Sequence, residues 1–432
     1  MAEHRRLDAF SLAALLVSAH YGLGFLLGTA EQTLNFGVAG SLYPVCLGLG
    51  TIAVLLLAKF YWTHVEQIWT LLGKSYGNSV KIGVGLMSWS SLIGIEAVQM
   101  ISGAFILKVL GMPVLPSMTA LAILFILISL LPVEKAGFLF RGLLVVNFVA
   151  LVWALWALQG FSEYGRSLIE FVPSLPQIGT ANLVGISLST ILLVLLDMKY
   201  QQFLVQAKDI RNLYQGCLIA AFCLLLLAFL PSSLVVAAQH QGILPAGLSG
   251  KETLPFILSW LGGGIHKPLG IALIMSLMIP ALGVGSSILR VQTKTILDFN
   301  LLSDRHSNRL IVTIANACLS LAIALKGGDI VNLIVSFYAA YVAAVLVPFF
   351  AYLLSQKNYY TFSITSVKLS LSLSTLLAIS LLLTNLINPK LINFLNIELD
   401  IIFIGIAFGL LGLLLGYLIE KDKIVPQIGE KT

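Results

Sequence analysis

The stretch SAHYGLGFLLGTAEQTLNFGVAG (Ser18–Gly40) decides how the rest of the chain is interpreted. It lies inside the first long apolar segment, yet it carries His20, Tyr21, Gly22, Gly24 and Gly28. Glycine weakens a helix interior by about 1 kcal/mol. Irregular backbone at membrane depth survives only where protein buries it or where it lines a cavity. The stretch therefore predicts a discontinuous helix over Ser18–Gly28 whose break faces a binding site. A close helix–helix contact through small residues is the alternative.

Composition places the chain among polytopic membrane proteins. Hydrophobic residues make up 58% of the 432 residues and charged residues only 10%, with a mean hydropathy of +0.98. The lipid bilayer is therefore an expected partner. The net charge of +6 is explained by loop charges, so we expect no nucleic-acid partner. The cysteines all lie in apolar runs, which disfavours a disulfide framework or a metal site: Cys46, Cys217, Cys223 and Cys318.

Hydropathy predicts an all-α protein with about twelve spans of about 20 residues each. The expected spans are 8–33, 38–58, 82–109, 115–132, 139–159, 179–203, 212–238, 266–298, 308–325, 330–354, 366–387 and 399–419. Lys and Arg are concentrated before the first span and after every even-numbered span. By the positive-inside rule both termini are cytoplasmic, in a plasma (inner) membrane.

Three segments between the spans are candidates for short helices. The external segments 159–182 and 239–270 are long and rich in Gly and Pro. Each could form a lid over an outward cavity or a structured loop without a gating role. The cytoplasmic segment 61–81 contains two Trp and reads as an interfacial helix.

Several motifs resemble the sodium/solute symporter family of proline, pantothenate, monocarboxylate and sugar symporters. GFLLGTAEQTLNFGVAGSLYPVCLGLG (Gly24–Gly50) resembles the family's first core helix pair. YQQFLVQAKDIRNLYQGCLIAAFCLLLLAFLP (Tyr200–Pro231) resembles the segment leading into the seventh core helix, and SSILRVQTKTILDF (Ser286–Phe299) the end of the eighth. The resemblance implies a LeuT-type fold: a ten-helix core over 1–355 with inverted repeats at about 8–160 and 178–355. Residues 356–432 would add two helices and a short cytoplasmic tail.

The chain departs from the family where sodium binds. In the family, carbonyls at the first-helix break act with hydroxyls on the eighth core helix. Counting back from Asp298 without gaps places Leu282 and Gly283 at those hydroxyl positions, with Ile279 one turn earlier. Ser286 and Ser287 would serve as sodium ligands only if the helix register slips by about one turn.

Ionisable residues inside spans suggest a different coupling ion. His20 lies at the break, and Glu96 lies in mid-span with Gln99 nearly one turn further on. Such groups are expensive in the membrane and are functional candidates. If Glu96 faces His20 across the cavity, the pair could carry a proton. The alternative is that both are hydrogen-bonded for packing. Asp197, beside Lys199, is explained by a local salt bridge.

Further polar residues are candidate solute ligands. Ser187, Ser189 and Thr190 are placed mid-span opposite the first break, where they would bond either a solute or their own backbone. Tyr338 resembles an aromatic gate residue, with packing as the alternative. At the break itself the candidates are His20, Tyr21, Gly22 and Gly24.

These features predict a secondary transporter rather than an enzyme. It would move a small polar organic solute by alternating access, coupled to Na+ or H+, without another cofactor or metal. A sugar is disfavoured, because sugar-transporting relatives carry an acid where this chain has Pro44. An amino acid or small carboxylate is favoured, because His20 and the N-terminus of a broken helix offer positive partners for a carboxylate. The other hypothesis is a membrane sensor or partner subunit that keeps the fold but does not transport.

Overall fold

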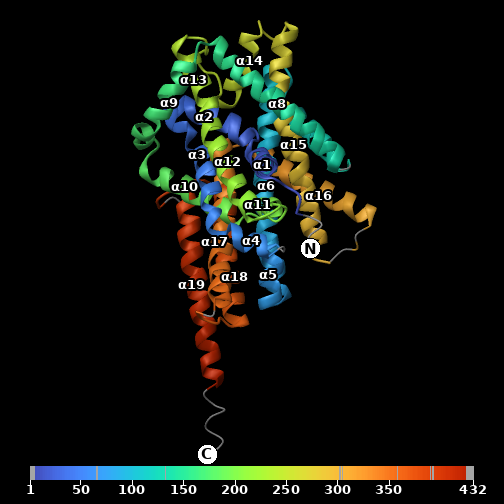
Figure 1. The fold of residues 1–432 in the computed structure, drawn as a ribbon, viewed down its shortest axis with the longest axis vertical. Coiled ribbons are helices and arrows are strands. Elements are labelled where there is room, and N and C mark those ends of the chain that lie inside the picture. Colours follow the sequence, from blue (N-terminus) through green and yellow to red (C-terminus); the bar gives the residue numbers. More distant parts are fainter. Residues whose placement is uncertain are drawn as a thin grey trace, which may run out of the picture.

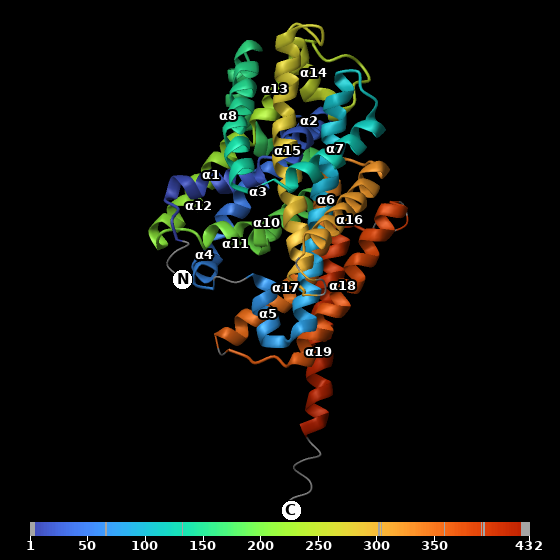
Figure 2. The ribbon, with the colours of Figure 1, turned by 90° about the vertical axis from the view of Figure 1, so that its right-hand side faces the viewer.

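The computed structural model describes residues 5–64, 67–131, 133–300, 303, 305–357, 359–389, 391 and 394–424. Side chains are not described for 133–143, 198–200 and 421–424, and the expected tail from residue 425 lies outside the described residues. Figures 1 and 2 show long helices stacked along one axis, with α13 and α14 at one end and α5 and the end of α19 at the other.

The chain is helical over most of its described length. The first part contains α1 (Ala9–His20), the π-helix η2 (Gly24–Gly28), α2 (Thr29–Phe36), η3 (Gly37–Ser41), α3 (Leu42–Ala53), α4 (Leu55–Thr63), α5 (Ile68–Tyr76), α6 (Asn78–Val109), α7 (Val114–Ser129), α8 (Val133–Ala157), α9 (Phe161–Ser174) and η4 (Leu175–Ile178). The second part contains α10 (Thr180–Leu196), α11 (Met198–Leu204), α12 (Ile210–Leu227), α13 (Leu230–His240), η5 (Gly250–Glu252), α14 (Thr253–Leu261), α15 (Pro268–Leu297), α16 (His306–Lys326), α17 (Ile330–Gln356), α18 (Ile364–Ile387) and α19 (Ile397–Ile424).

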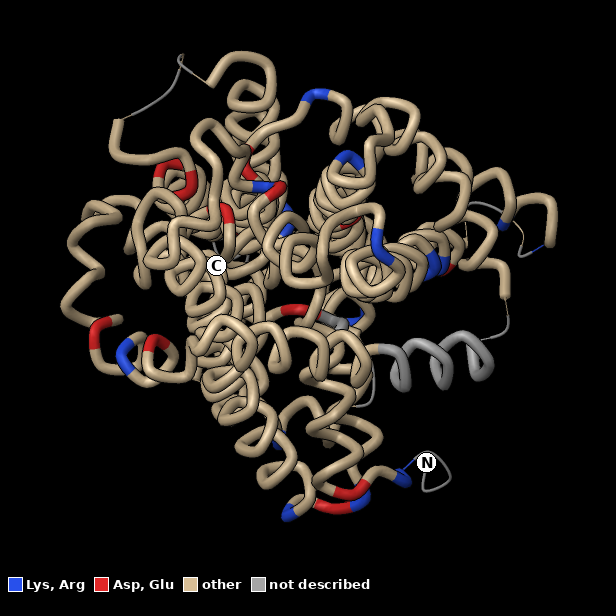
Figure 3. Tube along the Cα trace, turned by 90° about the horizontal axis from the view of Figure 1, so that it is seen from above, with Lys and Arg blue, Asp and Glu red and all other residues tan. Residues whose placement is uncertain are grey.

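The all-α multi-pass fold is confirmed, and the count of twelve is approximate. Within the described residues, nine helices are long and apolar enough to cross a membrane, or ten if α8 and α9 form one bent span. Two further expected spans fall on α1 and α7, which are shorter apolar helices. The short helices expected in the connecting segments are present as α5, α9 and α14. Figure 3 shows how few charged residues the helices carry.

The helices form two packed groups joined by α17. In one group α1 and α3 pack against α12, and α3 packs against α10. In the other, α6, α7, α15 and α16 pack against one another. Helix α17 contacts both α6 and α10, and 94% of its most apolar stretch is buried inside the protein. The helix is therefore the central element between the two groups. The division into repeats 8–160 and 178–355 stays a prediction.

The N-terminal ends of α1 and α12 are capped in the same way. The Asp8 carboxylate accepts from Ser11 N–H at 2.7 Å, and the Asp209 carboxylate accepts from Asn212 N–H at 2.8 Å. These backbone hydrogen bonds hold the pKa of both carboxyl groups below the usual value. Asn212 Oδ1 in turn accepts from Ala9 N–H at 3.0 Å. Two caps thus fix the start of α1 beside the start of α12.

The C-terminal pair α18 and α19 packs through glycine. A Cβ at Gly412 would lie 2.6 Å from the backbone N and Cα of Ser370, closer than any real contact. Backbone atoms of a helix do not yield as a flexible side chain does. The two helices therefore approach only because Gly412 has no side chain.

We expect Gly412→Ala to lower the stability of the protein by about 1–3 kcal/mol, because the added methyl group forces α18 and α19 apart. The measurement is the melting temperature of purified protein in detergent. Gly165→Ala is the control, since it adds the same methyl group to helix α9, where a Cβ meets open space. Equal melting temperatures for the two variants would contradict this account of the packing.

Candidate functional site

The first span is broken immediately after His20. Helix α1 ends there, and Tyr21 has φ −78° and ψ 68°. The Gly22 N–H donates to the His20 carbonyl at 2.8 Å, which makes Tyr21 the centre of an inverse γ-turn. A π-helical segment, Gly24–Gly28, follows before α2 begins. The discontinuity predicted over Ser18–Gly28 is confirmed.

The amide groups at the break have partners outside the normal helical pattern. The buried Leu23 N–H donates to Oε1 of Gln99 on α6 at 3.1 Å. Since Gly22 N–H bonds His20 O, neither amide reaches the carbonyl four residues earlier, on Ser18 or Ala19. A buried amide without a partner would cost about 1–3 kcal/mol. Gln99 removes that cost and leaves the end of α1 open to another hydrogen-bond donor.

The glycines after the break also serve close packing. A Cβ on Gly28 would lie 2.9 Å from Cγ2 of Ile330, and one on Gly24 would collide with Ile334. Both contacts are with α17, which therefore lies directly against η2. Both interpretations of these glycines therefore apply: the helix is broken here, and the glycines allow a close helix–helix contact.

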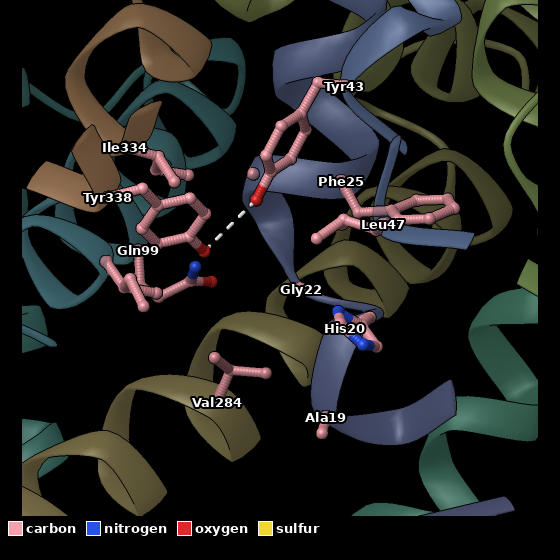
Figure 4. A pocket seen from close by; sticks show the side chains of 12 residues that line it. Ala19, His20, Gly22, Phe25, Tyr43, Leu47, Gln99, Val284, Ile334 and Tyr338 are labelled. Atoms are coloured by element: carbon pink, nitrogen blue, oxygen red, sulfur yellow. Dashed lines mark hydrogen bonds between the residues drawn. The ribbon is translucent and has the colours of Figure 1, made fainter. Parts of the chain in front are cut away.

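A small cavity lies against this break. It has about 20 Å³ open to a water-sized sphere, enough for about one water molecule. It is enclosed by Ala19, His20, Gly22, Gly24, Phe25, Tyr43, Leu47, Ile95, Gln99, Val284, Ile334 and Tyr338. In Figure 4 the Gln99 amide and the hydroxyls of Tyr43 and Tyr338 are directed into the same space beside Gly22.

The cavity wall is mostly apolar and carries a few polar groups. The hydroxyls of Tyr43 and Tyr338 lie 3.4 Å apart, joining α3 to α17. His20 Nε2 lies 3.5 Å from Thr51 Oγ1 on α3. The lining that the described residues form includes no Asp, Glu, Lys or Arg. The site is thus suited to hydrogen bonding, with one imidazole as its only ionisable nitrogen.

Five of the predicted site residues come together here: His20, Gly22, Gly24, Gln99 and Tyr338. Tyr21 is not part of the lining. Its hydroxyl donates to Asn147 Oδ1 on α8 at 3.1 Å, and Asn147 Nδ2 donates to the Ser276 carbonyl on α15 at 3.1 Å. Tyr21 therefore ties the break to two neighbouring helices.

Glu96 does not face His20, so the expected pairing of these two residues is wrong. Ile95 and Gln99 lie on the side of α6 that faces the cavity. Glu96 lies on another side of the helix. Its side chain is fully buried, and its Oε2 accepts from Ser320 Oγ on α16 at 2.9 Å.

The predicted hydroxyl ligands on α10 are also outside the lining. Ser187 accepts from Cys46 Sγ at 3.4 Å. Ser189 and Thr190 are fully buried, and neither hydroxyl has a hydrogen-bond partner. The alternative that these two bond their own backbone is therefore wrong, and a role as solute ligands stays a prediction.

Helix α15 brings no hydroxyl to the cavity. Ser286 Oγ donates to the Leu282 carbonyl at 2.6 Å, and Ser287 Oγ donates to the Val284 carbonyl at 2.9 Å. Both serines are thus committed to their own helix. The α15 residue at the cavity is Val284, so the one-turn register slip that Ser286 and Ser287 needed is not found.

Little in the sequence pointed to Tyr43, Val284 and Asn147. The lining residues of three helices come in pairs four residues apart: Tyr43 and Leu47, Ile95 and Gln99, Ile334 and Tyr338. This spacing places each pair on one face of its helix. Many apolar pairs in the sequence share the spacing, so it could not single these out.

The second break lies between α10 and α11, at Asp197, whose backbone is extended. Two of the carbonyls freed at the end of α10 accept hydrogen bonds from tyrosines. Tyr61 OH donates to Leu195 O at 2.7 Å, and Tyr341 OH donates to Leu196 O at 3.0 Å. The Lys199 side chain of the expected salt bridge lies outside the described residues.

A buried carboxylate joins the elements above the cavity. Glu31 on α2 accepts from Ile330 N–H, at the start of α17, at 2.9 Å, and its Oε1 lies 3.3 Å from Lys251 Nζ of η5. A Cβ on Gly250 would lie 2.8 Å from Glu31 Cγ, so the loop rests directly on this side chain. We call this set of contacts the Glu31 clasp.

Comparison of the fold with solved structures decides what kind of architecture this is. No protein-family model matches the sequence, and no curated protein matches it by sequence. A Na+-coupled sialic acid symporter in a substrate-bound outward-open state matches with a TM-score of 0.70, at 13% identity, over 96% of this chain and 91% of that one. The chain has the LeuT-type fold.

Two other solved transporters agree with this assignment. A manganese transporter from Eremococcus coleocola matches with a TM-score of 0.59, at 15% identity, over 95% of this chain and 94% of that one. A nucleobase-cation-symport-1 family transporter, in a closed conformation with bromovinylhydantoin bound, matches with a TM-score of 0.57, at 14% identity, over 96% and 92%. The LeuT-type architecture expected from the sequence motifs is confirmed, at identities that establish the fold alone.

Removal of the hydrogen bond between the Leu23 amide and Gln99 should destabilise the break. Gln99→Leu leaves the Leu23 amide without its acceptor, so the protein should lose about 1–3 kcal/mol of stability. The peptide that contains Leu23 should also exchange its amide hydrogens faster by mass spectrometry. The exposed Gln356→Leu at the end of α17 is the control. Unchanged exchange at the break in Gln99→Leu would show that this hydrogen bond does not hold it.

The Glu31 clasp predicts that Glu31→Gln opens the cavity toward the η5 loop. In a background without native cysteines, Ile334→Cys should react with a membrane-impermeant thiol reagent about tenfold faster once Glu31 is replaced, equivalent to about 1.4 kcal/mol. Glu163→Gln, which removes the exposed pair with Arg166, should leave the rate unchanged. Equal rates in the Glu31 and Glu163 variants would contradict the role of the clasp.

Proposed function

We propose that this protein is a secondary-active transporter that moves a small polar organic solute by alternating access. The observation that carries the proposal is the break after His20. There, backbone carbonyls are released from helical bonding beside a cavity enclosed by the two helix groups and α17. Broken helices at mid-membrane form the binding sites of many secondary transporters. The structural neighbours are named as a sialic acid symporter, a manganese transporter and a nucleobase-cation-symport-1 transporter.

The cavity chemistry supports an amino acid or a small carboxylate as the solute. His20, Gln99 and the two tyrosine hydroxyls provide hydrogen-bonding groups, while Phe25 and Leu47 give an apolar wall. An imidazole can pair with a carboxylate, and free carbonyls at the end of α1 can accept from an ammonium group. The lining supplies no carboxylate oxygens, which divalent metal ions prefer, so a metal ion is a poorer fit.

The same wall disfavours sodium at the usual position in this fold. Carbonyls at the break would need hydroxyl partners from α15, and that helix presents Val284 instead. An aliphatic side chain offers no ligand to a hard cation. We therefore propose that coupling, where it occurs, does not use a sodium ion bound between the break and α15.

Loop charge supports an orientation with both termini cytoplasmic in the plasma membrane. In that orientation the Glu31 clasp and the loop before α14 lie on the outer side, and α5 lies on the inner side. The Tyr43–Tyr338 contact, near the start of α3 and in the first third of α17, would then close the cavity from outside. Transport requires this contact and the clasp to open.

We expect one class of solute to raise the melting temperature of the purified protein. At a concentration of about 100 times the dissociation constant, a ligand that binds only the native state adds about 2.7 kcal/mol of stability. A panel of amino acids, small carboxylates and sugars is compared in sodium and in potassium buffer. The stabilising solute should then accumulate in proteoliposomes. Its effect should be lost in His20→Ala and weakened in Tyr338→Phe.

The outcomes distinguish the hypotheses. Stabilisation by sodium alone would restore sodium symport and contradict the interpretation of Val284. Stabilisation by a solute without uptake would favour the membrane sensor or partner subunit. Arg166→Ala on the exposed face of α9 is a control that should keep both binding and uptake, because Arg166 pairs with Glu163 of the same helix and neither residue lines the cavity.

A further inference from the structure

A second buried polar site lies inside the group formed by α6, α15 and α16. Its centre is Glu96, which is fully buried and receives one hydrogen bond, from Ser320 Oγ at 2.9 Å. Gln292 of α15, also fully buried, lies against the same carboxyl group. The site is on a different side of α6 from Ile95 and Gln99, which line the cavity. It is therefore separate from the solute pocket.

Three polar atoms at this site have no hydrogen-bond partner. They are Oε1 of Glu96 and both Oε1 and Nε2 of Gln292. Buried polar groups are almost always hydrogen-bonded, and each exception needs an explanation. The free oxygen of the Glu96 carboxyl group and the Gln292 amide next to it form a pair that one proton can connect.

The groups that face Glu96 are neutral. Those that act on its carboxyl group are the Ser320 hydroxyl and the Gln292 amide. The nearby polar residues of α15 and α16 bond elsewhere: Asn316 accepts from Trp89 at 3.1 Å, and Thr293 bonds Thr313 at 2.9 Å.

Among the described residues, no charged side chain of the helices packed against α6 acts on the Glu96 carboxyl group. Arg290 of α15 donates to carbonyls at the end of α7, including Ser129 O at 3.0 Å. On α17, Tyr338 lines the cavity and Tyr341 donates to Leu196 O. On α16, Cys318 is exposed. No cation among the described residues therefore fixes the Glu96 carboxyl group in its ionised form.

We propose that Glu96 is a proton-binding site in the scaffold of this transporter, with Gln292 as the partner that accepts either protonation state. In the protonated state the carboxyl O–H donates to the Gln292 carbonyl oxygen. In the ionised state the amide turns and its N–H donates to the carboxylate. Ser320 donates to the other oxygen in both states. One proton is bound or released, and no other bond is made or broken.

The position of Glu96 connects this proton to the solute pocket. Gln99, one turn further along α6, holds the Leu23 amide at the break. Val284, two turns before Gln292 on α15, lines the cavity. A change in the Glu96–Gln292 contact would therefore shift α6 and α15, both of which contribute to the pocket wall. As a coupling mechanism the inference rests on the proposed function, whereas proton binding itself does not.

The first experiment measures the proton without transport. Infrared difference spectra of the purified protein, recorded over a range of pH, should contain a band from a protonated buried carboxylic acid. Glu96→Gln should remove the band, and Gln292→Leu should shift it, because the carboxyl O–H loses its acceptor while Ser320 still donates to the other oxygen. Glu398→Gln is the matched control, since Glu398 is also buried and accepts from Ser336 Oγ at 3.1 Å. Survival of every carboxylic-acid band in Glu96→Gln would overturn the proposal.

The second experiment measures coupling in proteoliposomes, with the amino acid or small carboxylate that stabilises the protein supplied outside, and with vesicles preloaded with it for the counterflow assay. Uptake driven by an inward proton gradient should fall at least tenfold in Glu96→Gln, while counterflow exchange of solute continues. Glu398→Gln should keep gradient-driven uptake. Uptake that ignores the gradient in the native protein would overturn the coupling while leaving transport intact. A carboxylic-acid band without any uptake would support the proton site and contradict the proposed function.

Discussion

The hydrogen bond from the Leu23 amide to Gln99 is the contact on which the site depends. A helix cannot break in a medium without water unless the released groups find other partners. Gln99 supplies that partner from α6, and the inverse γ-turn at Tyr21 supplies the other through Gly22 and His20. Because Gln99 belongs to the opposite helix group, the break exists only while α6 lies beside it. The binding cavity and the contact between the two groups are therefore one structural feature.

Close packing keeps that arrangement rigid on its other sides. Gly24 and Gly28 let α17 approach the first span, and α17 in turn bonds the second break through Tyr341. One helix thus contacts both discontinuous spans. Motion of α17 would therefore change the geometry at the two breaks together.

The sequence predicted the helices and the first break because both are local properties. Polar and glycine residues inside an apolar run identify the break without knowledge of any neighbour. The direction in which the Glu96 side chain points is not a local property of the sequence. On a helix, one residue turns the side chain by about 100°, so whether position 95 or 96 faces His20 depends on how α6 is rotated against α1. The same holds for α15, where Val284 rather than Ser286 reaches the cavity. The rotation of one helix against another is determined by packing between segments that are distant in the sequence. It cannot be predicted from the sequence of either helix alone.

At the two breaks, opposite kinds of backbone group have hydrogen-bond partners. The open backbone acceptors at the pocket are therefore all on one side of it. At the first, Gln99 occupies an amide, and the carbonyl end of α1 stays open. At the second, Tyr61 and Tyr341 occupy the carbonyls of α10. A solute of the proposed kind would therefore meet open acceptors from one broken span alone. Its donor end should be held beside Ala19 and its apolar end beside Phe25 and Leu47. A third contact, from the His20 imidazole to a carboxylate of the solute, would complete the three points of attachment that discrimination between enantiomers requires.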